Sequence, residues 1–225
     1  RERLSLEGFP LFAPERGDAF SFFWNGYALS FTPKNLLLSL TSGGRPLLTE
    51  RAPLAVNMGG EFGRGQTHYL VREEGERIYG LGDKGGNLDK SGRRFRLDST
   101  DALGYDAETS DPLNKHIPFY ICQNGAGTVG LFYDTHASCV FDFGAEISNY
   151  TGPYRRFSTD DEALAYYVLL GTIPEIVSAF SRLTGGCAFL PRRALLYWGS
   201  TMAYTDAADA DAQLKAFADT CCEKR

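Results

Sequence analysis

Residues 79–119 read YGLGDKGGNLDKSGRRFRLDSTDALGYDAETSDPLNKHIPF, and the rest of the chain can be interpreted from this stretch. Two glycine-punctuated turns and a short strand pattern come first, and a long acidic, aromatic loop follows them. Loops of that length between strands are uncommon, and they are usually either functional or disordered. The aromatic side chains of the loop, and the apolar run at 117–119 that closes it, favour the functional interpretation.

The composition indicates a globular β protein with an acidic surface. The chain has 225 residues, of which 43% are hydrophobic, so it can bury a sizeable core as one large or two smaller domains. A net charge of -5 argues against a nucleic-acid partner, because that role needs a basic surface that displaces counterions from phosphates. The densest basic patch, Arg93, Arg94 and Arg96, is interpreted as a solvated strand face rather than a phosphate clamp.

Cysteine usage indicates reduced thiols and no redox or metal motif. The five cysteines are an odd number, they are scattered, and no two have the C-x-x-C spacing. Such thiols are typical of a cytosolic protein, so we expect a cytoplasmic location. No run approaches the ~18 apolar residues of a membrane span, and residues 1–10 lack the apolar core of a signal peptide. We therefore expect no membrane partner, although a signal cut away before residue 1 would change the location.

The histidines give no indication of a metal site. The chain contains only His68, His116 and His136, which are far apart in the sequence. We expect no metal or other cofactor. Lys115 and His116 are expected to order the long loop by pairing with its acidic residues.

Short apolar or alternating runs separated by turn residues predict about a dozen strands, arranged as two packed antiparallel sheets. Asn25-Gly26 predicts a type I′ hairpin, and Gly43-Gly44 supplies the positive φ angles of a second tight turn. A glycine-rich hairpin is expected between residues 76–81 and 95–97, and another around residues 124–127. The predicted strands are residues 20–24, 27–31, 35–41, 45–48, 67–71, 76–81, 95–97, 119–123, 128–133, 138–143, 154–159 and 163–169.

The period of the pattern changes from strand to helix at Gly171. Thr172 and Glu175 have the spacing of a capping box, with a proline in the first turn. Apolar residues recur at helical spacing from 173 to 183, and Gly185-Gly186 ends the pattern. A helix is predicted here.

The last thirty or so residues have a different pattern. The apolar run 194–198 predicts a strand buried on both faces, residues 199–206 a loop, and residues 207–224 a helix with Asp206 as its N-cap. One βα unit cannot bury its own strand, because a parallel strand needs neighbours on both sides. We therefore expect the chain to stop just inside a second domain.

Several ordered motifs carry a family resemblance over residues 77–215. They are YGLGDKGGNLDKSGRRFRLDSTDALGYD, DPLNKHIPF, VGLFYD, LAYYVLLG, LTGGCAFLPRRALLYWGS and YTDAADA. Together they resemble the amino-terminal region of glycoside hydrolase family 31. The resemblance implies a mainly β chain: an antiparallel, galactose-mutarotase-like β-sandwich at residues 1–171, a helix and linker at 172–193, and the first βα unit of a (β/α)8 catalytic barrel at 194–225.

The resemblance also implies an activity. Members of the family are retaining α-glycosidases that hydrolyse or transfer non-reducing-end α-glucosyl units, or act on α-xylosides, α-galactosides or sulfoquinovosides, without metal or nicotinamide. Their two catalytic aspartates lie on later barrel strands and have no matching positions here. Retaining hydrolysis needs two carboxyl groups about 5 to 5.5 Å apart, so we expect this chain alone to be inactive. The expected partners are an α-linked oligosaccharide and the rest of the barrel.

Candidate substrate residues come from the same resemblance, which implies that a loop of the sandwich lines the leaving-group side of the pocket. Asp101 matches the loop aspartate that accepts sugar hydroxyls, with an Asx-turn as the alternative. Asp106 and Asp111 are further candidates. Tyr105 either stacks on a sugar or pins the loop, and Tyr204 would be a pocket wall on a barrel loop.

Two other functions stay open at this point. One is a carbohydrate-binding sandwich that works without a barrel, which predicts measurable sugar affinity for the chain alone. The other is a degenerate enzyme that has lost its catalytic residues.

Overall fold

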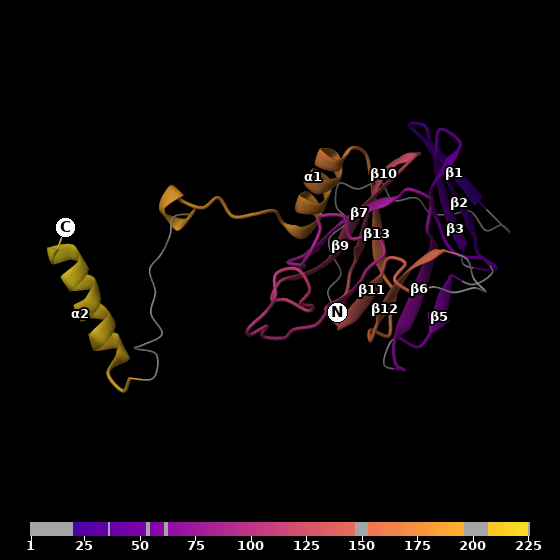
Figure 1. The fold of residues 1–225 in the computed structure, drawn as a ribbon. Coiled ribbons are helices and arrows are strands. Elements are labelled where there is room, and N and C mark those ends of the chain that lie inside the picture. Colours follow the sequence, from indigo (N-terminus) through magenta and orange to yellow (C-terminus); the bar gives the residue numbers. More distant parts are fainter. Residues whose placement is uncertain are drawn as a thin grey trace. The chain divides into compact units, whose positions relative to one another are not determined.

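The computed structural model describes residues 20–35, 37–52, 55–60, 63–146, 153–195 and 207–224. It divides the chain into two compact units, Arg1–Gly186 and Cys187–Arg225, which are described separately. The described part of the first unit consists of antiparallel sheets and one α-helix, α1, while that of the second contains the helix α2 (Figure 1).

The described part of the first unit forms three antiparallel sheets. The first sheet has the order β1 (Phe20–Trp24), β2 (Tyr27–Thr32), β3 (Leu37–Ser42), β4 (Arg45–Thr49). The second has the order β13 (Tyr166–Leu170), β10 (Gly127–Tyr133), β9 (His116–Asn124), β7 (Arg77–Gly82). The third has the order β5 (Val56–Met58), β6 (Gln66–Val71), β12 (Tyr154–Thr159), β11 (Cys139–Asp142), β8 (Arg94–Leu97).

The second and third sheets face each other and share one hydrophobic core, so the predicted antiparallel β-sandwich is confirmed. Tyr133 of β10 stacks on Phe157 of β12 with ring centroids 3.8 Å apart. Buried residues of the first sheet, such as Leu40 and Leu48, extend the same core. The expectation of two sheets alone was wrong, because β1–β4 pair among themselves and form a third sheet.

Local turn chemistry explains the hairpins that the sequence predicted. Asn25 and Gly26 have φ angles of 45° and 81°, as a type I′ turn requires, and Trp24 pairs with Tyr27 across it. The turn between β3 and β4 likewise has positive φ at both glycines, and β9 and β10 form a hairpin.

The predicted hairpin between residues 76–81 and 95–97 was wrong. β7 pairs with β9 in the second sheet, whereas β8 pairs with β11 in the third. The glycine-rich connection therefore crosses from one sheet to the other. Both strands keep their apolar side chains inside, because Ile78 and Leu81 in β7 and Phe95 and Leu97 in β8 are buried.

A buried polar network ties the first sheet to the sandwich. The Glu50 carboxylate accepts hydrogen bonds from Nε2 of His68 at 2.9 Å, the hydroxyl of Tyr166 at 2.6 Å and the backbone N–H of Leu38 at 2.6 Å. These donors belong to β6, β13 and β3, so one carboxylate joins all three sheets. Burial by itself raises the pKa of Glu50, but the bonds from His68 and Tyr166 outweigh it and leave that pKa below its ordinary value.

Helix α1 (Ile173–Thr184) confirms the helix predicted from the capping box. The Glu175 carboxylate accepts the backbone N–H and the hydroxyl of Thr172, at 2.8 and 2.7 Å. Ile176 is fully buried against the second sheet, where β10 has Gly130. A Cβ at Gly130 would lie 2.5 Å from Ile176 Cγ2, so glycine is what allows this close approach.

The second unit contains the 3-10 helix η1 (Arg192–Leu195) and α2 (Ala210–Glu223). The prediction of a strand starting at residue 194 was wrong, because Ala194 and Leu195 lie in η1; residues 196–198 are outside the described part. Asp209 occupies the N-cap position of α2, three residues after the predicted N-cap Asp206. Asp206 lies outside the described residues. The expectation of a barrel start at 194–225 stays a prediction.

All five cysteines are free thiols, two buried and three exposed. Burial raises the pKa of Cys122 and of Cys139 to about 12, so both are protonated and unreactive at neutral pH.

Within the described residues, no three or more His, Cys, Asp or Glu side chains gather as a metal site would require. Nor is any helix of that part long and apolar enough to cross a membrane.

Candidate functional site

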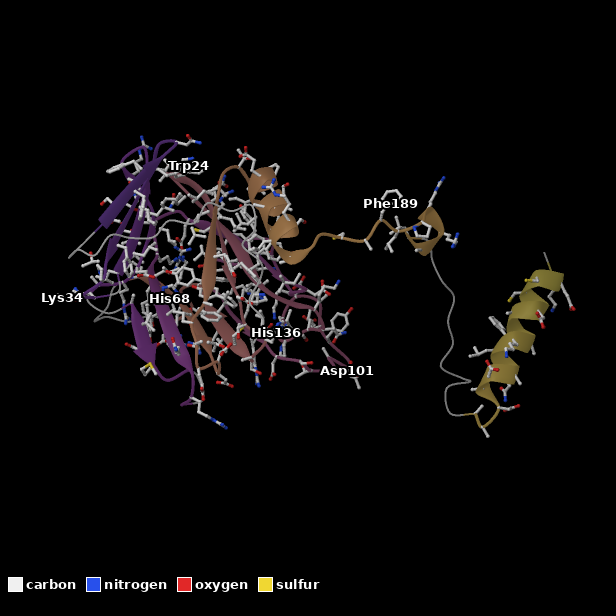
Figure 2. All side chains as sticks on the ribbon, turned by 180° about the vertical axis from the view of Figure 1, so that it is seen from behind. Trp24, Lys34, His68, Asp101, His136 and Phe189 are labelled. Carbon is white, nitrogen blue, oxygen red and sulfur yellow. The ribbon has the colours of Figure 1, made fainter. Side chains whose placement is uncertain are left out.

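The candidate site is built on the loop of residues 98–115, which connects β8 of the third sheet to β9 of the second. Figure 2 shows Asp101 at the outer limit of the sandwich, away from the sheets. Long loops of this kind carry function when a rigid scaffold positions them. Hydrogen bonds to Lys84 and within the loop fix one part of it, and the other part faces solvent.

Lys84 anchors both ends of the loop from the turn that follows β7. Its side chain is 0% exposed, and Nζ donates to the carbonyl of Arg96 at 2.6 Å and to Oδ1 of Asp111 at 2.8 Å. Nδ1 of His116, at the start of β9, lies 3.5 Å from the same Nζ. Burial lowers the pKa of Lys84, and the ion pair with Asp111 partly offsets that effect.

Asp111 uses both carboxylate oxygens to hold the loop. Oδ1 pairs with Lys84, and Oδ2 accepts the backbone N–H of Arg96. The predicted sugar contact of Asp111 would compete with these bonds. Lys115, which we expected to order the loop, is largely exposed. Its Nζ lies 3.5 Å from Oδ2 of Asp83, farther than Lys84 lies from Asp111, so Lys115 is a weaker anchor than Lys84.

Asp106 organises the outer part of the loop as an Asx-type turn. Its Oδ1 accepts the backbone N–H of Glu108 at 3.0 Å, and the N–H and hydroxyl of Thr109, both at 2.8 Å. These hydrogen bonds lower the pKa of Asp106, the hydroxyl contributing most. Ser110 Oγ accepts the backbone N–H of Asp106 at 2.8 Å, which closes the turn.

Asp101, Tyr105, Asp106 and Asp111 are all exposed, but Asp106 and Asp111 use their carboxylates for hydrogen bonds within the loop or to Lys84. Among the described residues, no group donates a hydrogen bond to the Asp101 carboxylate, and Tyr105 is 59% exposed. The loop thus presents the Asp101 carboxylate and the Tyr105 ring to solvent on a base fixed by Lys84. Tyr204, the fifth predicted residue, lies outside the described residues.

A groove of about 520 Å³ runs beside the loop, and the sequence did not predict it. The loop contributes one wall, the connection between β10 and β11 another, and α1 a third. Its polar lining residues are Asp98, Ser99, Asn114, His116, Asp134, Thr135, His136, Ser138 and Thr184. Figure 2 shows His136 on this side of the sandwich. The sequence signal for the groove was the polar run of Thr135, His136 and Ser138 after VGLFYD, but the spacing of these residues did not identify a binding motif.

The groove and loop carboxylates with shifted pKa values do not provide a general acid at neutral pH. The pKa of Asp98 is lowered, chiefly by the hydroxyl of Ser138, which donates to it at 2.8 Å. Like Asp106, Asp98 is therefore ionised at neutral pH and cannot act as a general acid. Burial raises the pKa of Glu76, but this residue lies in the core beside Arg155. Burial and the charge of Lys84 lower the pKa of His116, so its ring is neutral near pH 7.

The family of the chain follows from its sequence. Residues 11–142 match the family described as "Glycosyl hydrolase 31 N-terminal galactose mutarotase-like domain". The match covers more than half of the chain and includes β1 to β11 and the loop. The chain belongs to this family, as the sequence motifs indicated.

Relatives of known activity support the same family. An α-glucosidase of Bacillus thermoamyloliquefaciens is 28% identical over 157 residues, which are 69% of this chain and 19% of the relative. An α-xylosidase of Lactiplantibacillus pentosus is 34% identical over 133 residues, 58% of this chain and 16% of the relative. The chain therefore spans about a fifth of the length of these relatives or less.

Solved structures show the same fold. A family 31 dextranase of Flavobacterium johnsoniae, complexed with glucose, has a TM-score of 0.67 at 24% identity, over 79% of this chain and 21% of the dextranase. A family 31 α-xylosidase from a soil metagenome, complexed with xylose, has a TM-score of 0.58 at 17% identity, over 79% of this chain and 27% of the other.

Proposed function

We propose that this chain is the sandwich domain of an α-glycosidase that acts on α-glucosides or α-xylosides, and that its loop of residues 98–115 binds sugar on the leaving-group side of the pocket. The names of the relatives support this substrate class, since both α-glucosidases and α-xylosidases are among them. One observation supports the role of the loop most strongly. Lys84 fixes the base of the loop, while the Asp101 carboxylate and the Tyr105 ring remain free to contact a sugar.

The proposal gives each loop residue a role. Asp101 accepts hydroxyl groups of the sugar, because a carboxylate can take two donors at once and its charged hydrogen bonds are the stronger kind. Tyr105 covers an apolar face of the ring. Asp106 and Asp111 keep the loop in one conformation, so less entropy is lost when the sugar binds.

Bond cleavage itself is assigned to a barrel supplied by sequence beyond this chain. The retaining mechanism needs a nucleophilic carboxylate and a protonated carboxyl group about 5 to 5.5 Å apart. Asp98 and Asp106, whose pKa values are lowered, cannot supply the protonated member of such a pair at neutral pH. The relatives' greater length supports a further domain that does so.

Hydrolysis of para-nitrophenyl α-glucoside and α-xyloside tests this proposal. The full-length protein is expected to release nitrophenol from at least one of them, and the 225-residue chain from neither. Turnover by the short chain above a blank would contradict the assignment of cleavage to the barrel. A full-length protein that cleaves neither glycoside nor any α-linked disaccharide would contradict the proposed activity.

A second candidate function is a sugar-binding sandwich that needs no barrel. It is supported by a hollow of about 540 Å³ at the β1–β2 hairpin, where Phe23 and Trp24 are 81% and 58% exposed. Exposed aromatic clusters often mark binding surfaces. Calorimetric titration of the chain with maltose, isomaltose and xylose separates the two candidates, since measurable affinity that is lost in Trp24→Ala supports the second.

A further inference from the structure

We propose that Lys84 is a positioning residue for the leaving-group sugar: its buried ammonium holds the loop of residues 98–115 in the conformation that binds this sugar. This inference rests on the proposed function. Lys84 does not face the exposed part of the loop, so it would act on the sugar only through the loop.

Lys84 donates two hydrogen bonds to the two ends of the loop, and a third polar group lies beside its ammonium. An ammonium group has three N–H donors and no acceptor. Its three neighbours are the carbonyl of Arg96, Oδ1 of Asp111 and Nδ1 of His116, at 2.6, 2.8 and 3.5 Å. Arg96 lies just before the loop, while Asp111 and His116 lie at its far end. One side chain thus closes the loop.

The turn that carries Lys84 is itself packed under the loop. The backbone N–H of Asp83 donates to the carbonyl of Lys115 at 2.9 Å, and that of Gly86 to the carbonyl of Ala107 at 3.1 Å. A Cβ at Gly85 would lie 2.8 Å from the Ala107 carbonyl oxygen. The GLGDKGG turn therefore supports the loop from below, and its glycines allow the two backbones to approach closely.

The consequence for catalysis depends on the substrate. A loop that is loosened at its base would hold the leaving-group sugar less well, and a misplacement of 1 Å can reduce a rate by about 10²-fold. A substrate without a leaving-group sugar would not be affected. Selective loss therefore separates loop positioning from general damage to the enzyme.

The test compares the full-length protein with Lys84→Met on two substrates: an α-linked disaccharide that the wild type cleaves, and the glycosyl fluoride of the same sugar. We expect kcat/KM to fall about tenfold for the disaccharide, within the range that misplacement can cause, and to stay within about twofold for the fluoride. Lys34→Met is the matched control, because it makes the same change at an exposed turn. It should leave both values unchanged.

Each other outcome has a defined meaning. An equal loss on both substrates, or no loss on either, would overturn the role of Lys84 while leaving the proposed function standing. A wild type that cleaves neither substrate would overturn the proposed function, and the inference with it. If Lys84→Met does not fold, Asp111→Asn removes the negative charge of the pair but keeps an oxygen acceptor for the ammonium, and it should show the same selective loss. Failure of both variants to fold would assign the pair to folding and overturn the inference.

Discussion

Replacing Asp111 by alanine should destabilise the 225-residue chain more than replacing its partner Lys84 by methionine. The Lys84 side chain is 0% exposed and the Asp111 side chain 19% exposed, so the two partners differ in access to water. Asp111→Ala leaves a buried ammonium without its carboxylate, and breaking a buried pair in this way costs roughly 3–5 kcal/mol. Because Asp111 is partly solvated, we expect about 3 kcal/mol, the lower end of that range.

The reverse change has a smaller expected effect. After Lys84→Met, the Asp111 carboxylate can still be hydrated and still accepts the N–H of Arg96. We expect a loss of about 1–2 kcal/mol, typical of one hydrogen bond to a charged group. The double variant should be no less stable than Asp111→Ala alone, because it contains no unpaired buried charge.

Urea unfolding followed by circular dichroism measures all four proteins of this cycle. The reasoning is refuted if Asp111→Ala costs less than about 1 kcal/mol, or if Lys84→Met costs more than Asp111→Ala. Either result would mean that the ammonium is hydrated or has another partner once the carboxylate is removed.

Three further predictions concern the scaffold. Ile176→Ala, at a position that is fully buried, should cost about 3 kcal/mol in urea unfolding, whereas Val177→Ala, 46% exposed in the same helix, should cost less than about 1. Gly82→Ala should destabilise the chain more than Gly92→Ala, since both have positive φ but only at Gly82 would the new Cβ lie 2.5 Å from a backbone oxygen; equal losses would rule out that clash. The pKa of Glu50 is lowered in the folded chain, so the stability that its ionised carboxylate contributes is present above pH 4.5 and is lost as pH falls through the folded-state pKa. Glu50→Gln should therefore lose less stability in acid than the wild type. Thermal unfolding from pH 6 to about pH 3 measures this difference.

Features fixed by neighbouring residues were predictable from the sequence. Asn25-Gly26 gave the first hairpin because an adjacent pair with positive φ permits only a few turn types. Helix α1 was predicted to within a residue at its start, since Thr172 and Glu175 cap it from within its own first turn. The family resemblance likewise rested on contiguous motifs.

Features that depend on distant pairing were not predictable. The strands on either side of GLGDKGG looked like a hairpin because they are close in the sequence, but β7 pairs with β9 and β8 with β11. Sheet membership depends on strands farther along the chain, which a local pattern does not specify.

The roles of the loop residues were only partly predictable. A lysine in a glycine-rich turn looks solvated, so nothing in the sequence indicated that Lys84 is buried beneath the loop. The family resemblance singled out Asp101 and left Asp106 and Asp111 as further candidates. Their hydrogen bonds distinguish them, since Asp106 and Asp111 are used within the loop and Asp101 is not.

A crystal structure of the full-length protein with an uncleaved thio-linked disaccharide tests the central claim most directly. The claim is that the sandwich domain supplies a sugar contact to the pocket of an α-glycosidase. The account predicts that the Asp101 carboxylate lies about 2.6–3.2 Å from a hydroxyl of the leaving-group sugar, as a hydrogen bond requires. A bound disaccharide whose leaving-group sugar contacts no residue of 98–115 would contradict it.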